Sequence, residues 1–257
     1  QTGIVKTEYY SEFYITSLLY NKPIEDVVDN LFYGIGIFSI TFPPSVKTIG
    51  NYAFYESDIH NIDWYDNITS IGEHSFYANG SSTTLPTYIT NFPILKLPSS
   101  LQTIGKYAFS NYKGYAKFLL PDGVLNIGVG GFENTKITEF VIPYGITKVE
   151  NSTFSDCYKL KTIIIPNSVT EIGKYAFENC ALKTVNIPNS VTNIEKDAFS
   201  NCSNLTNIKC EAITAPTLGI DAFYNVGSNG TLYYPQGSDY SIWLNALSEY
   251  GWTGAPY

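Results

Sequence analysis

A phenylalanine recurs along this chain at intervals of 22 to 24 residues, with one longer interval of 33. An apolar residue stands five positions before each of them. The nine are Phe32, Phe54, Phe76, Phe109, Phe132, Phe154, Phe177, Phe199 and Phe223. A unit of this length cannot bury its own apolar face, so it must stack on its neighbours. The period therefore predicts one β-rich solenoid of about nine repeats of 22–23 residues, in place of several small domains.

Each repeat is expected to contain two strands and two turns. Ile163 and Ile165 alternate with Ile164, which predicts a strand with the first two side chains inward and the third outward. Pro166 ends that strand because it cannot donate a ladder hydrogen bond. A second short strand follows, and Gly173 permits a tight corner before the recurring phenylalanine.

The ends of the chain depart from the repeat. We expect an N-terminal lead-in over 1–14, the solenoid over 15–231 with an insertion near 78–90, and a C-terminal capping strand and helix over 232–257. The helix, from Asp239 to Tyr250, places Trp243 and Leu247 on the same face as Tyr250 and should cover the last open sheet edge. A chain that begins with Gln1 and has no Met is expected to lack its original start, through leader cleavage or truncation.

Composition excludes two classes of function. The net charge is −8 and the chain has no Arg, so it is a poor match to nucleic-acid phosphates. No stretch approaches the ~18 consecutive apolar residues of a membrane-spanning helix.

The repeat resembles a known family. The unit Leu-x-x-Ile-x-Ile-Pro-x-x-Val-x-x-Ile-Gly-x-x-Ala-Phe-x-x-Cys is similar to the BspA-like bacterial leucine-rich repeats, from about Ile15 to Ser238 and most strongly around Phe154, Phe177 and Phe199. The resemblance implies a right-handed, curved leucine-rich-repeat solenoid that is secreted or anchored at the cell surface. It also implies adhesion to host or microbial proteins, with no catalytic residues.

Three cysteines follow the recurring phenylalanine by three residues and are expected to stack as a column. They are Cys157, Cys180 and Cys202. Neighbours in the column come near the reach of a disulfide, but buried free thiols are the favoured interpretation. Cys210 occupies an inward strand position. His74 is expected to lie coils away from Cys157, which argues against a Cys–His dyad.

No catalytic, metal or cofactor site is expected. The acidic residues Glu25, Asp26 and Asp29 form no recurring pair, and the two His are expected to be surface residues. The glycine run from Gly128 to Gly131 fills ordinary repeat positions and is interpreted as structural.

The outward positions of the longer strands give the first candidate binding site. Leu119, Val141 and Ile164 are predicted to form an apolar stripe with a polar rim, as protein-binding patches have. The rim consists of Asp63, Lys96, Asn186 and Lys209. β-propensity alone could also place Val and Ile there.

Two further features are candidates for recognition. Tyr88 and Ile89 belong to the insertion, and inserted loops on rigid scaffolds often carry function, although sequence drift explains such a loop equally well. Tyr52, Tyr107 and Tyr175 share one repeat position and are expected to form an exposed column.

These features together predict a non-catalytic extracellular module for protein or glycan binding and adhesion. The partner would be a host or microbial surface protein, or a glycan. The alternative is a structural spacer within a larger cell-surface protein.

Overall fold

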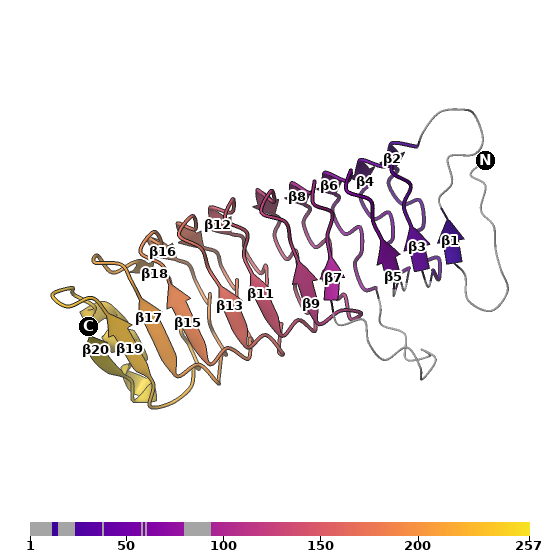
Figure 1. Ribbon diagram of the computed structural model, residues 1–257. Helices are drawn as coiled ribbons and strands as arrows, with labels where there is room; N and C mark the ends of the chain where they lie inside the picture. The colour runs from indigo at the N-terminus through magenta and orange to yellow at the C-terminus, as the bar shows by residue number, and fades with distance from the viewer. Residues whose placement is uncertain (1–11, 15–23, 38, 58, 60, 80–93) are drawn as a thin grey trace. The chain divides into compact units, whose positions relative to one another are not determined.

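The computed structural model describes residues 12–14, 24–37, 39–57, 59, 61–79 and 94–257. They belong to two compact units, Gln1–Lys136 and Ile137–Tyr257, which we describe separately. Each unit is a parallel β-solenoid, with about nine turns in all and a small C-terminal helix, so the predicted fold class is confirmed (Figure 1). The predicted limits at 14/15 and 231/232 stay predictions.

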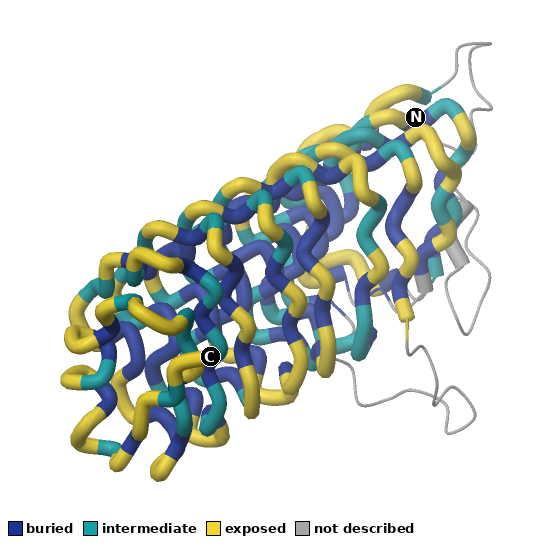
Figure 2. Tube along the Cα trace, turned by 60° about the vertical axis from the view of Figure 1, so that its left-hand side comes forward, coloured by how far each residue is buried: buried dark blue, intermediate teal, exposed yellow. Residues whose placement is uncertain are grey.

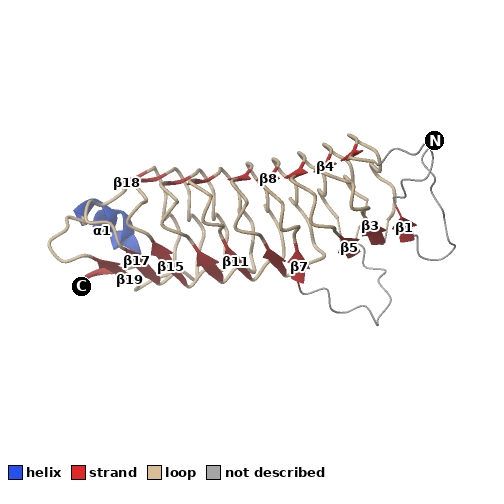
Figure 3. Cartoon of the chain, turned by 45° about the horizontal axis from the view of Figure 1, so that its top comes forward, coloured by secondary structure: helices blue, strands red, loops and turns tan. Residues whose placement is uncertain are grey.

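Within each unit a row of longer strands and a row of two-residue strands lie on opposite sides of the coils (Figure 3). The longer strands of the first unit are β1 (Glu12–Tyr14), β3 (Ser39–Thr41), β5 (Asn61–Asp63), β7 (Ile94–Lys96) and β9 (Lys117–Leu119). Its short strands are β2 (Asp26–Val27), β4 (Thr48–Ile49), β6 (Ser70–Ile71), β8 (Thr103–Ile104) and β10 (Asn126–Ile127).

The second unit repeats this arrangement and adds the C-terminal elements. Its longer strands are β11 (Glu139–Val141), β13 (Thr162–Ile164), β15 (Thr184–Ile187), β17 (Asn207–Cys210), β19 (Thr231–Tyr234) and β20 (Thr253–Pro256). Its short strands are β12 (Lys148–Val149), β14 (Glu171–Ile172), β16 (Asn193–Ile194) and β18 (Thr217–Leu218). The helix α1 (Ser241–Leu247) continues into the 3-10 turn η1 (Ser248–Tyr250).

The recurring phenylalanines form the core of each unit. Phe177 is fully buried, and its ring stacks on Phe154 and Phe199 with centroids 5.4 and 5.1 Å apart. Aliphatic side chains from both rows of strands surround this stack, so burial alternates along every coil (Figure 2). Parallel rings at this separation are favourably offset, and every coil thereby seals its neighbour.

The turn around each phenylalanine has a backbone pattern that the repeat alone does not reveal. The residues two before and two after the phenylalanine have left-handed backbone in all nine coils, for example Tyr175 at φ 58° and Asn179 at φ 56°. Their N–H groups and that of Phe177 donate to carbonyls of the next coil, at 2.8–3.1 Å. These bonds offset the strain of left-handed residues, and Asn and Gly tolerate that conformation best.

The C-terminal cap differs from the prediction in one respect. The predicted helix forms, and Trp243 and Leu247 are buried, with the Trp243 ring 5.3 Å from Phe223. The open sheet edge, however, is not covered by the helix, because β20 returns the chain into the sheet and pairs with β19. β20 becomes the edge strand, and Pro256 removes one of its donors, which protects an edge from further pairing.

The long interval between Phe76 and Phe109 contains residues 80–93, which lie outside the described part. Ala78 and Asn79 still occupy regular turn positions, so the insertion begins after them. Asn79 is fully buried and bonds Ile59 N–H through Oδ1 at 2.8 Å and the Phe54 carbonyl through Nδ2 at 2.6 Å. The Tyr112 hydroxyl donates to the carbonyl of Ile59 at 3.0 Å, so side chains hold these coils together next to the insertion.

Candidate functional site

The outward positions of the longer strands are exposed as predicted. Leu119, Val141 and Ile164 are 40%, 56% and 54% exposed, although each lies beside a buried residue on its own strand. Asp63, Lys96 and Asn186 are also exposed. Because strand side chains alternate in direction, the inward residues fix the outward ones in place.

The structure brings together only part of the predicted stripe. Val141 pairs directly with Ile164, and β13 lies beside β15, which carries Asn186. Leu119 pairs with Lys96 in the first unit. Leu119 and Val141 belong to different units, so a continuous stripe of three stays a prediction. Tyr88 and Ile89 lie outside the described residues.

The outer face of the longer strands in the second unit is nearly free of charge; we call it the long-strand face. Only Glu139 and Lys209 carry charge there, and Lys209 pairs with Glu211 at 3.1 Å. The twelve outward residues are Glu139, Val141, Thr162, Ile164, Thr184, Asn186, Asn207, Lys209, Thr231, Tyr233, Thr253 and Ala255. Depletion of charge distinguishes the core of a protein interface from ordinary surface.

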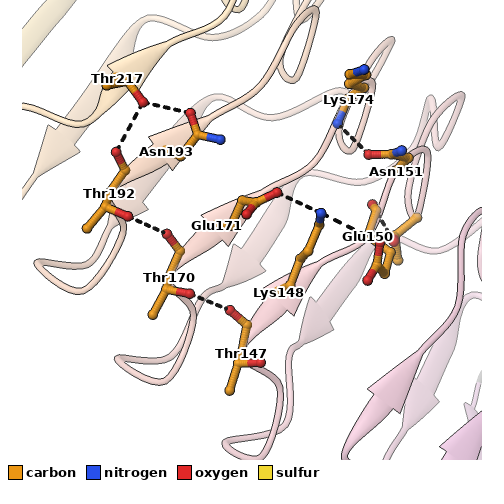
Figure 4. Close-up of polar contacts among 11 residues, drawn as sticks. Thr147, Lys148, Glu150, Asn151, Thr170, Glu171, Lys174, Thr192, Asn193 and Thr217 are labelled. Atoms are coloured by element: carbon orange, nitrogen blue, oxygen red, sulfur yellow. Dashed lines mark hydrogen bonds and ion pairs between the residues drawn. The ribbon is translucent and has the colours of Figure 1, made fainter.

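The short-strand side of the same unit has a different character (Figure 4). The Lys148 ammonium lies 2.6 Å from the Glu171 carboxylate and 4.0 Å from Glu150, and the hydrogen bond to Glu171 raises the pKa of Lys148. Beside this group, Thr hydroxyls link successive coils. The Thr170 hydroxyl donates to the Thr147 carbonyl at 3.1 Å, and the Thr192 hydroxyl donates to the Thr170 carbonyl at 3.3 Å. Polar groups on this side are therefore satisfied within the coil stack.

All four cysteines are buried free thiols, as predicted for core positions. The Sγ atoms of Cys180 and Cys202 donate to the phenylalanine carbonyl of the preceding coil, at 3.2 and 3.1 Å. Ser57 and Asn79 make the same bond from the equivalent position in the first unit. Burial raises the pKa of Cys202 to about 12. A thiol held in this way is a hydrogen-bond donor in the core, unlike a reactive cysteine.

The predicted tyrosine column is corrected in its members and its exposure. Tyr52 and Tyr107 are half-buried, and the residue between them is His74, which we expected to be a simple surface residue. The imidazole stacks between the two phenol rings with both centroid distances at 4.9 Å. Tyr175 lies in the second unit, where Ser152 and Asp197 occupy the neighbouring positions.

A second aromatic row runs beside the first. Tyr33, Tyr55 and Tyr77 follow the recurring phenylalanine by one residue and stack with centroids 4.8 Å apart. The His74 ring meets Tyr77 edge-on at 5.4 Å, which joins the two rows. We call these six residues the aromatic surface; the sequence signal for it is that Tyr recurs at fixed offsets from the recurring phenylalanine.

The remaining candidate residues have structural roles. Glu25 pairs with Lys47 at 3.0 Å, Asp26 accepts from the Thr48 hydroxyl, and Asp29 accepts from the Asn51 N–H. A Cβ on Gly128 would lie 2.6 Å from the Lys106 nitrogen, so this glycine allows a close approach of two coils. Within the described residues, no three His, Cys, Asp or Glu side chains converge as metal ligands would.

The family of the chain is shown by a match that spans almost all of it. The model described as BspA type leucine rich repeat region, in six copies, matches residues 2–93, 87–206 and 125–242. The chain belongs to the BspA-type leucine-rich repeat family. Proteins of this kind are generally non-catalytic. No helix in the described part of this family member is long and apolar enough to cross a membrane.

Solved structures share the fold at low sequence identity. A leucine-rich repeat protein from Bacteroides ovatus aligns with a TM-score of 0.63 and 22% identity, over 91% of this chain and 69% of its own. The T. pallidum leucine-rich repeat protein aligns with a TM-score of 0.56 and 22% identity, over 76% and 77%. A leucine-rich cell surface protein from Faecalibacterium prausnitzii aligns with a TM-score of 0.51 and 19% identity, over 99% and 92%. No curated protein matches the chain.

Proposed function

We propose that this protein is a non-catalytic binding and adhesion module, secreted or anchored at a cell surface, that binds a host or microbial surface protein or glycan. The observation that carries the proposal is the pairing of Val141 with Ile164, both more than half exposed, on the nearly uncharged long-strand face. When a partner covers this face, burial of the apolar centre is favourable, and removing the surrounding Thr and Asn side chains from water costs less than removing charged side chains would.

The family and its relatives support an extracellular role. One of the structural relatives is described as a cell surface protein, and the repeat belongs to the same fold. The four thiols do not oppose export, because each is buried and so shielded from oxidants.

A structural spacer is the second candidate, and the turns favour it. Side-chain amides donate to polar side chains of the preceding coil: Asn179 donates to the Asp156 carboxylate at 2.7 Å and Asn225 to the Asn201 amide oxygen at 2.9 Å. Polar groups used inside the stack make a stiff support and leave less for recognition. In a spacer, Val141 and Ile164 are there only because β-branched residues favour strands.

Substitution of the paired residues separates the two candidates. The double variant Val141→Lys with Ile164→Glu leaves the net charge unchanged and sets opposite charges across neighbouring strands, which maintains the pairing. The matched control, Thr48→Lys with Ser70→Glu, places the same pair on β4 and β6, which also pair in register. A panel of immobilised extracellular proteins and surface glycans is then tested with all three proteins.

We expect the wild type and the control to bind one member of the panel and the Val141/Ile164 variant to lose at least tenfold in affinity, or about 1.4 kcal/mol. Equal binding by all three proteins would remove the long-strand face from the proposal. No binding by any of them would support the spacer. Thermal unfolding of each variant establishes that the fold is retained.

The insertion is tested by replacing residues 80–90 with a short Gly-Ser linker. Asn79 is buried on one side of the segment and Ile94 belongs to β7 on the other, so the coils should stay folded. A loss of panel binding in this variant would assign recognition to the insertion, which includes Tyr88 and Ile89. Unchanged binding would assign the insertion no part in it.

A further inference from the structure

The long-strand face of the second unit has a basic margin at the end where the chain enters its strands. Lys161 immediately precedes β13 and Lys183 immediately precedes β15, and these two strands lie side by side (Figure 1). Lys159 comes two residues before Lys161, and all three residues are exposed. We call these three residues the lysine margin. It gathers positive charge on neighbouring coils of a chain whose net charge is −8.

These lysines differ from others in the same unit. Lys148, Lys196 and Lys209 each form an ion pair with a carboxylate, at 2.6, 3.5 and 3.1 Å. Across the residues that the structure describes, no carboxylate lies within ion-pair distance of the lysine margin. The Lys159 Nζ lies 5.9 Å from the centre of the Tyr158 ring, which leaves its charge uncompensated. The positive charge of the margin is therefore open to a partner.

Two carboxylates belong to the neighbouring parts of these coils, and neither pairs with the margin. Glu139 is on β11, the strand that pairs with β13. Asp156 precedes Lys159 by three residues and accepts a hydrogen bond from the Asn179 amide at 2.7 Å. Three lysines against two carboxylates leave an excess of positive charge at this end of the strands.

The lysine margin adjoins the exposed apolar pair of the same face. Val141 pairs with Ile164, and Ile164 follows Lys161 by three residues along the same extended segment. Three residues of extended chain span about 10 Å. One short segment of a partner can therefore contact the ammonium groups and the apolar pair at the same time.

This combination favours one chemical class of partner. A sulfated or carboxylated glycan offers negative charge but no apolar side chain to cover Val141 and Ile164. A protein segment can carry carboxylates and an apolar side chain next to one another. Covering the apolar pair contributes affinity, while complementary charge selects the partner and speeds its association.

We propose that the long-strand face binds an acidic segment of a partner protein. Its Asp or Glu carboxylates contact the lysine margin, and a neighbouring apolar side chain covers Val141 and Ile164. This inference rests on the proposed function, because it names the partner that the same face would bind.

The test uses a labelled synthetic peptide, Gly-Glu-Glu-Leu-Glu-Glu-Leu-Gly, with binding to the full chain followed by fluorescence anisotropy. One comparison peptide has Gln in place of every Glu, and another has Gly in place of every Leu. We expect the first peptide to bind with an affinity that falls as salt rises, and each comparison peptide to bind at least tenfold more weakly. Equal binding of the neutral peptide, or no binding of the acidic one, would overturn the proposal.

Variants of the lysine margin locate the site. Lys161→Gln with Lys183→Gln should weaken binding of the acidic peptide about tenfold. The matched control, Lys106→Gln with Lys174→Gln, removes two exposed lysines that follow the short strands β8 and β14 and should leave binding unchanged. If the control loses as much affinity as the margin variant, the binding reflects overall charge and the proposal is wrong.

The apolar pair is tested by Val141→Thr with Ile164→Thr, which keeps β-branched residues in both strands. This variant should also bind the acidic peptide about tenfold more weakly. Unchanged binding would contradict the proposal, because the lysines would then act alone. Circular dichroism and thermal unfolding establish that each variant is folded.

Two further outcomes decide between this inference and its alternatives. Tighter binding of a sulfated heparin oligosaccharide than of the acidic peptide would identify a glycan ligand and overturn the inference. If panel binding is lost in the Val141/Ile164 charge variant but kept in the Lys161/Lys183 variant, the inference fails and the proposed function stands. If both variants keep panel binding, the inference fails together with the role of the long-strand face.

Discussion

The thiol of Cys202 donates a hydrogen bond to the carbonyl oxygen of Phe177, 3.1 Å away and one coil earlier. The same repeat position holds Ser57 in the first unit, and its hydroxyl donates to the carbonyl of Phe32. In these coils the position therefore holds a donor to a buried carbonyl, which Cys, Ser and Asn side chains each supply. Its chemistry is hydrogen bonding, whichever of these side chains supplies the proton.

This equivalence predicts the outcome of substitution at Cys202. Cys202→Ser keeps a donor and should change the free energy of unfolding by less than about 1 kcal/mol. Cys202→Ala leaves the Phe177 carbonyl without its partner and opens a small cavity, which should cost about 1–3 kcal/mol. Urea unfolding of both variants measures the difference. Equal stability of the two would mean that the bond contributes nothing.

Burial of the thiols predicts their reactivity. Because burial raises the pKa of Cys202 to about 12 and that of Cys180 and Cys210 above the ordinary value, little thiolate forms near neutral pH. A thiol reagent should label none of the four cysteines in the folded protein and all four after unfolding without reductant. Fewer than four labels in the unfolded chain would indicate a disulfide and contradict the free-thiol assignment.

His74 predicts a dependence of stability on pH. Burial lowers its pKa in the folded state, while Glu73 acts in the opposite direction and less strongly. A base with a lowered folded pKa stabilises the fold above its unfolded pKa of about 6.5, and that stability is lost as pH falls through the folded pKa. Urea unfolding at pH 7.5 and pH 5.5 should show a loss for the wild type.

The control for this prediction is His74→Asn. Asn tolerates left-handed backbone, and Asn30 holds the equivalent position two repeats before His74. The variant should lose less stability than the wild type between the two pH values. An identical loss in both proteins would assign the dependence to other groups.

Two glycines predict opposite results for the same substitution. A Cβ on Gly105 would lie 2.5 Å from the carbonyl carbon of Gly72, whereas a Cβ on Gly36 meets nothing within 4 Å. Gly105→Ala should cost about 1–3 kcal/mol by forcing two coils apart, and Gly36→Ala should be within about 1 kcal/mol of neutral. Thermal or urea unfolding of the two variants decides it; similar stability would refute the close approach.

Much of the architecture could be predicted because one residue type is tied to one position in the coil. Phe177 and Gly173 are set by burial and by close approach, and both effects recur in every repeat, so periodicity reveals them. The strand of Ile163 and Ile164 follows from alternation for the same reason. The buried cysteine column followed from its constant offset from the phenylalanine.

What the sequence did not reveal depends on contacts between coils or on chain outside the repeat. His74 stacks between Tyr52 and Tyr107 because all three occupy the same repeat position. A search for a repeated residue type finds the two tyrosines and misses the histidine between them. The left-handed turns are indicated only weakly, by an Asn that recurs two residues after the phenylalanine in several repeats. β20 has none, because a four-residue strand with Gly254 and Pro256 has low β-propensity and forms only by pairing with β19.

In the second unit, the backbone hydrogen bonds between the phenylalanine turns all point the same way along the coil stack. N–H groups around each phenylalanine donate toward the next coil, so the last coil is left with donors and no following carbonyls. The Tyr250 hydroxyl supplies one missing acceptor, at 2.9 Å from the Asn225 nitrogen. Tyr250 therefore ends the series of hydrogen bonds at the last coil. A repeat gained by gene duplication can be accommodated between existing coils, but a repeat added after the last coil would have to displace the cap.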